Sequence, residues 1–76
     1  MNRFRFAKLL RQGKVLRVEI LHVTWISYII RVKYNLEDGS NKHTLLESFF
    51  GNILSFVSIV DAKRYLSQYS DLKEAY

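Results

Sequence analysis

The side chains whose types could support metal binding or catalysis are two histidines and several serines. His22 falls near the end of the first predicted strand and His43 near the start of the third, on the order of 20 Å apart at about 3.3 Å per residue. They therefore cannot share a metal ion, and neither has a cysteine or an acidic neighbour at ligand spacing. No serine stands in a nucleophile-elbow motif, and the isolated Gly39 and Gly51 form no phosphate-binding loop. We expect no catalytic residue, no metal and no cofactor.

Basic side chains are concentrated in the first half of the chain. Residues 1–33 contain eight lysines and arginines against Glu19 alone, which gives +7; the other residues carry −2, and the whole chain +5. Cations gathered on one helix attract polyanions by releasing counterions from phosphates, whereas a solvated basic face simply keeps a small protein in solution. The predicted open face of the sheet lacks central aromatic residues, so nucleic-acid contact would be through phosphates and nonspecific. The candidate polyanion-binding residues are Arg3, Arg5, Lys8, Arg11, Lys14, Arg17 and Lys33.

Three large aromatic residues, Trp25, Phe49 and Phe50, fall in predicted turns. In an antiparallel meander the first and third turns lie at the same end of the sheet, so the three rings can form one cluster. Such a cluster is either covered by the helices or exposed as a contact patch. We take these residues as a candidate interaction patch for a protein partner or a second copy of the chain.

The elements that position these residues follow from hydrophobic periodicity and from the three glycines. A 3.6-residue period before Gly13 and after Ser58 predicts helices, and alternation of apolar and polar residues between them predicts strands. The predicted elements are a helix over 3–12, strands over 15–23, 26–36, 42–48 and 53–56, and a helix beginning after Ser58. This α-β-β-β-β-α order indicates an α+β fold, a four-strand antiparallel meander with both helices on one face, and a single domain over residues 1–76.

An odd-length first hairpin loop, for example Thr24-Trp25-Ile26, gives the first two strands a consistent register. The core face then contains Leu16, Val18, Ile20, Ile30, Val32 and Tyr34. On the open face, Glu19 lies opposite Arg31 and Arg17 opposite Lys33. The Asp-Gly turn at residues 38–39 is expected to bring Glu47 to the other side of Arg31.

These structural positions also carry a family resemblance. The matching residues are Leu9-Leu10, Gly13-Lys14-Val15, Arg17 to Leu21, Tyr28, Arg31-Val32, Gly51, Leu54, Phe56, Ser58, Ala62 and Leu66. From about Phe6 to Leu66 the chain resembles a family of small bacterial proteins known as a domain of unknown function. The resemblance implies the fold and no activity, and members continue past the second helix. This chain departs from the pattern at Trp25-Ile26, where the family has small residues, and at Ile53, where it has proline.

We expect neither an export signal nor a membrane-spanning segment in this chain. Two leucines follow the first basic residues before Arg11-Gln12-Gly13 intervenes, whereas an export signal needs seven or more apolar residues. The stretch from Val23 to Ile30 is far shorter than the about 20 apolar residues of a membrane-spanning helix. We therefore expect a cytoplasmic protein without membrane contact. The sequence favours a non-catalytic protein-interaction or self-associating module, with nonspecific nucleic-acid binding as the alternative.

Overall fold

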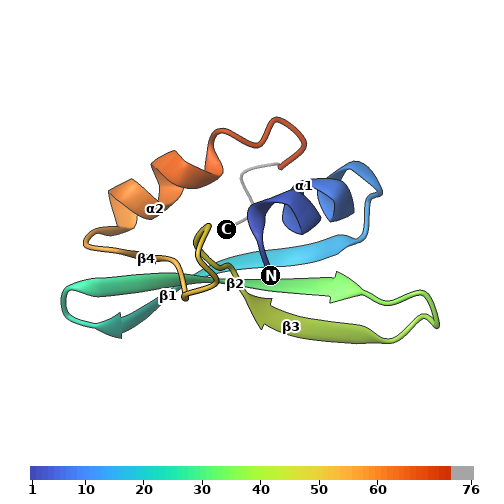
Figure 1. Ribbon diagram of the computed structural model, residues 1–76, viewed down its shortest axis with the longest axis horizontal. Coiled ribbons are helices and arrows are strands. Elements are labelled where there is room, and N and C mark those ends of the chain that lie inside the picture. Colours follow the sequence, from blue (N-terminus) through green and yellow to red (C-terminus); the bar gives the residue numbers. More distant parts are fainter. Residues whose placement is uncertain (73–76) are drawn as a thin grey trace.

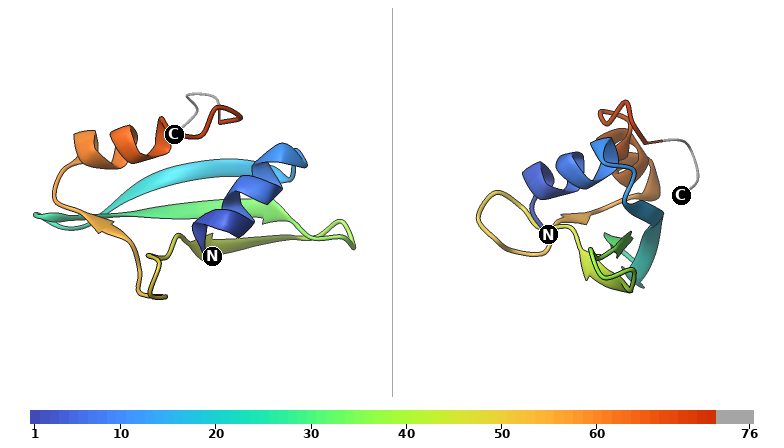
Figure 2. Two further views of the ribbon diagram at one scale, coloured as in Figure 1. Left: turned by 45° about the horizontal axis from the view of Figure 1, so that its top comes forward. Right: turned by 90° about the vertical axis from the view of Figure 1, so that its right-hand side faces the viewer.

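The computed structural model describes residues 1–72, and it places two helices on one face of an antiparallel sheet (Figure 1). The elements are α1 (Arg3–Arg11), β1 (Val15–Thr24), β2 (Ser27–Asn35), β3 (Asn41–Leu45), β4 (Ser55–Phe56) and α2 (Ile59–Leu66). Both views in Figure 2 show α1 and α2 on the same side of the strands. The predicted α+β class, the element order and the placement of both helices on one face are confirmed.

The helices begin and end where the capping residues predict. The Asn2 side chain accepts a hydrogen bond from the Arg5 amide at 2.9 Å, and the Ser58 hydroxyl accepts one from the Asp61 amide at 3.1 Å. Gly13 has φ +69°, a left-handed conformation that ends α1. There the Lys14 amide donates to the Leu9 carbonyl at 2.9 Å. Gly13 and the Lys14–Leu9 bond therefore set the point at which α1 ends and the chain continues into β1.

The register of β1 and β2 follows the prediction over their central part. Val18 lies opposite Val32, and Glu19 lies opposite Arg31. A bulge between Val15 and Arg17 shifts the strand so that Val15, instead of Leu16, lies opposite Tyr34. The prediction that Leu16 belongs to the core is therefore wrong, and its side chain is 49% exposed. The prediction obtained this register from a hairpin loop of three residues. In the structure the extra residue is instead supplied by a second irregularity in β1, between His22 and Thr24.

The sheet departs from a simple meander at its fourth strand. β3 pairs with β2 over Asn41–Leu45, and β4 also pairs with β2, with Phe56 opposite Tyr28. β3 and β4 thus lie one after the other along the same edge of β2, since β3 ends after five residues and leaves the other part of that edge to β4. The predicted flanking of Arg31 by Glu47 is also wrong. Glu47 instead accepts a hydrogen bond from the Met1 amino group at 2.6 Å.

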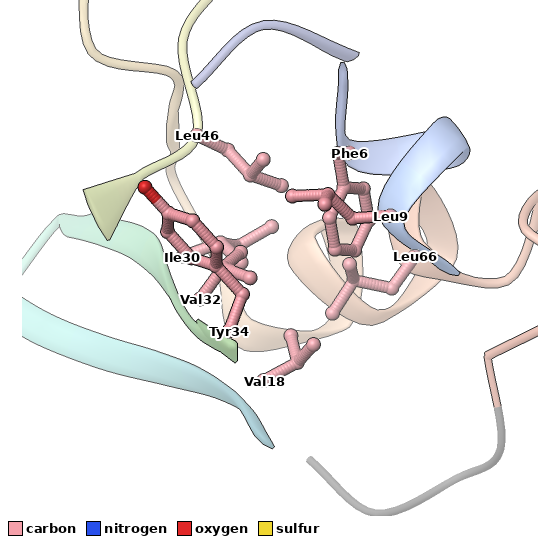
Figure 3. Close-up of a cluster of buried hydrophobic side chains, with 8 residues drawn as sticks. All are labelled: Phe6, Leu9, Val18, Ile30, Val32, Tyr34, Leu46 and Leu66. Atoms are coloured by element: carbon pink, nitrogen blue, oxygen red, sulfur yellow. The ribbon is translucent and has the colours of Figure 1, made fainter. Parts of the chain in front are cut away.

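The core lies between the helices and the sheet (Figure 3). Phe6 and Leu9 from α1 and Leu66 from α2 pack over Val18, Ile30, Val32, Tyr34 and Leu46. Phe6, Ile30 and Val32 are completely buried, and Phe6 contacts Tyr69 edge-to-face with ring centroids 4.9 Å apart. Because these side chains occupy the helix face of the sheet, the residues between them on β1 and β2 point to the open face.

Candidate interaction surfaces

Two stretches of the sequence contain no charged side chain, residues 20–30 and residues 48–60. The structure pairs them, because β4 lies antiparallel to the first residues of β2, with Ser55 opposite Ile29. Figure 1 shows the β1–β2 turn and the start of α2 at one end of the molecule, whose longest dimension is 37 Å. The turn between β2 and β3, which carries Glu37 and Asp38, lies at the opposite end.

The uncharged end of the molecule exposes a group of large apolar side chains. We call this surface the neutral end; its residues are Val23, Trp25, Ile26, Val57, Ile59 and Val60. Trp25 is 84% exposed and Val57 is 75% exposed. Ile59 is also exposed, although the helical period of α2 predicts it on the buried side with Ala62 and Leu66, which are buried.

Phe49 and Phe50 lie on a separate projecting loop, between β3 and β4. They are 76% and 85% exposed and contact each other edge-to-face at 5.4 Å between ring centroids. Their loop is closed by a bridge between Glu47 and Ile53, and Figures 1 and 2 show it apart from the β1–β2 turn. Within residues 1–72, Trp25 pairs with no other aromatic ring. All three predicted patch residues are therefore exposed, but on two separate surfaces.

Sequence reasoning missed the α2 and β4 part of the neutral end. Val57 lies between the predicted strand over 53–56 and Ser58, and Val60 is not on the buried side of the helical period, so neither pattern points to them. The signal that finds them is the absence of charge over residues 48–60, taken together with the pairing of β4 and β2. That pairing is a long-range fact, and local periodicity carries no information about it.

The seven predicted polyanion-binding residues divide between two faces. Five of them are on α1 or at its ends and lie on the helix side of the sheet: Arg3, Arg5, Lys8, Arg11 and Lys14. The other two, Arg17 and Lys33, lie opposite each other in β1 and β2, on the open face. A broad groove of about 860 Å³ runs between α1 and the β2–β3 turn. Arg5, Lys8 and Lys14 line it together with Glu37 and Asp38, so its charge is mixed. The Arg5 guanidinium lies 5.6 Å from the centre of the Tyr34 ring.

The open face of the sheet carries one short charge cluster. Arg31 donates to the Glu19 carboxylate at 2.9 Å, and Arg17 lies 3.9 Å from the same carboxylate. The hydrogen bond from Arg31, followed by the charges of Arg31 and Arg17, lowers the pKa of Glu19, although partial desolvation opposes this. Glu19 is therefore ionised at neutral pH. Arg31 is held by Glu19, whereas Arg17 is exposed and available to a second carboxylate.

The two histidines lie in different surroundings. His22 stacks on Tyr28 with ring centroids 4.6 Å apart, and His43 on β3 lies opposite Lys33. Among residues 1–72, no group of three histidine, cysteine, aspartate or glutamate side chains is placed to hold a metal ion. In the same part of the chain no helix is long and apolar enough to cross a membrane.

Comparison with family models, curated proteins and solved structures found no match to this chain. The surfaces described above are therefore interpreted from their own geometry and chemistry.

Proposed function

We propose that the protein is a cytoplasmic, non-catalytic module that works by protein–protein contact, and that the neutral end is its contact surface. The observation that carries this proposal is the exposure of Trp25 at 84% beside further exposed apolar side chains, with no charged residue in either contributing stretch. A tryptophan ring of this exposure offers on the order of 200 Å² to a partner. Apolar groups of this size on one surface are typical of interaction sites.

The occupant that the surface fits best is a second copy of the chain. In a two-fold contact the same patch meets itself, so a patch with a net charge would meet the same net charge. Residues 20–30 and 48–60 contain none. The chain's net charge of +5 comes from other segments, above all from α1, which carries four cations and no carboxylate. The neutral end is thus the surface where two copies meet with the least electrostatic repulsion.

Sedimentation of the whole chain over a range of concentrations tests this proposal. We expect reversible association that Trp25→Ser weakens by about thirtyfold or more, since truncating a central tryptophan is typically worth at least about 2 kcal/mol. Phe50→Ser is the matched control, because it removes a ring of equal exposure from the other projection. Equal effects of the two substitutions, or a monomer at high micromolar concentration, would overturn the proposal.

A second candidate function is nonspecific binding to nucleic acid through α1. Within residues 1–72, no carboxylate lies within ion-pair distance of Arg3, Arg5 or Lys8, so these cations are open to phosphates. Binding to duplex DNA should then weaken steeply with added salt. Lys8→Glu should weaken it further, whereas Lys33→Glu on the open face should change it less. Absence of binding at low salt would exclude this function.

A further inference from the structure

Within residues 1–72, β1 forms one edge of the sheet. In the part of the chain that the structure describes, β1 pairs with β2 and with no other strand. The Leu46 amide donates to the Ile30 carbonyl at 2.9 Å, so the backbone of Ile30 points toward β3. Its partner Ile20 therefore points its own amide and carbonyl away from β2. By alternation the same holds for Val18 and His22, and these groups are available to another strand.

Charge decides how a second β1 strand could pair here. In an antiparallel pair, two residues that face each other either both point their amide and carbonyl groups toward the partner strand or both point them away. When the two strands are copies of β1 related by a two-fold axis, the axis must therefore lie between the two copies of one residue. An axis through Arg17 or Glu19 sets that residue against its own copy, and like charges repel. An axis through Ile20 or Leu21 sets Glu19 against an apolar residue. An axis through Val18 sets Arg17 against the partner's Glu19 and Glu19 against the partner's Arg17.

A hollow beside the same edge supports that register. It has a volume of about 230 Å³ and lies between the end of α1, the start of β1 and residues 71–72, which follow α2. Its apolar lining comes from Leu10, Val15, Leu16, Val18 and Leu72. With the axis through Val18, the partner's Ile20 lies opposite Leu16, at the mouth of this hollow. Leu16 is half exposed because of the β1 bulge, and this contact would cover it.

We propose that two copies of the protein pair antiparallel through the free edge of β1, with the two-fold axis at Val18 and two reciprocal Arg17–Glu19 contacts. The pairing extends the sheet across both molecules and keeps the helices of both on one face. It does not involve the neutral end, so the two contacts can be tested and can fail separately. A chain with both contacts assembles beyond a dimer, because each contact joins one pair of copies.

Charge reversal tests the edge contact. Arg17→Glu places glutamates opposite each other twice in the dimer, and we expect it to weaken edge pairing on the order of tenfold. Lys42→Glu makes the same change of charge on the opposite edge strand and is the matched control. The measurement uses sedimentation in the Trp25→Ser background, where the neutral end no longer contributes. Equal dissociation constants for the two charge variants, or a monomer in that background before any charge reversal, would overturn the edge pairing.

Mixing two variants gives a positive test. Arg17→Glu chains and Glu19→Arg chains each repel their own copies, but a mixed pair has opposite charges at all four positions. We expect mixed dimers to exceed both homodimers, provided that circular dichroism shows the Glu19→Arg chain folded despite the loss of its bond to Arg31. Mixed pairing no stronger than the homodimers would contradict the Val18 axis.

Amide hydrogen exchange tests the edge contact on the unmodified chain. The amides of Glu19 and Leu21 point toward β2 and should be protected at every protein concentration. The amides of Val18 and Ile20 should become protected as the concentration rises. If they are protected equally at the lowest concentration, the edge is covered within one chain; if they stay unprotected at the highest, it is free. Either result would overturn the proposal.

Discussion

Replacement of Phe6 by alanine tests the packing of α1 on the sheet. Phe6 is completely buried, and its ring contacts Tyr69 edge-to-face at 4.9 Å. Truncating a buried phenylalanine costs about 3–5 kcal/mol. At about 0.05–0.15 kcal/mol per residue, a chain of 76 residues has about 4–11 kcal/mol of stability in all. Phe6→Ala therefore removes a large share of it, and the melting temperature should fall by at least about 12 °C.

Phe4→Ala is the matched control, because Phe4 lies on the same helix and is 66% exposed. We expect its free energy of unfolding to stay within about 0.5 kcal/mol of the unmodified chain. Urea unfolding should be followed by far-ultraviolet circular dichroism, since the exposed Trp25 ring reports little on the core. Similar losses of stability in both variants, or a small loss in Phe6→Ala, would refute the placement of α1 on the sheet.

Three further substitutions test single features of the fold. Ser58→Ala should lower the free energy of unfolding by about 1 kcal/mol in urea titration, because it removes the acceptor for the Asp61 amide at the start of α2. Gly13→Ala should cost about 1–2 kcal/mol through backbone strain at φ +69°, with no steric contribution, because a Cβ there meets no atom within 4 Å. Glu19→Gln should flatten the acid side of the stability profile. The bond from Arg31 lowers the pKa of Glu19 in the folded state, so its stabilisation is present above the ordinary value of 4.5 and is lost as the pH falls through the lowered value. If unfolding of this variant and of the unmodified chain has the same pH dependence, the Glu19–Arg31 bond contributes nothing.

Local signals in the sequence account for most of the helices and for the central register. Gly13 and Ser58 cap helices by chemistry that operates within a few residues, so their roles follow from the sequence alone. The opposition of Glu19 and Arg31 follows because a shift of one residue would bury a carboxylate in the core. These features are fixed by short-range geometry and by the cost of burying charge.

The errors come from features that depend on distant segments. The bulge that exposes Leu16 is set by how α1 and Lys14 meet β2, where the Asn35 amide bonds to the Lys14 carbonyl. The position of Glu47 depends on the amino group of Met1, far away in the sequence. Pairing of β4 with β2 depends on where β3 ends, and it is this pairing that assembles the neutral end from two uncharged stretches.

Fluorescence of Trp25 measured against protein concentration tests the neutral end most directly. Trp25 is the single tryptophan of the chain and is 84% exposed, so it reports on that surface without labelling. We predict that quenching by iodide is strong at low micromolar concentration and decreases as the protein is concentrated, with a matching blue shift of the emission. Emission and quenching that stay constant from micromolar to millimolar concentration would contradict a contact between copies at this surface.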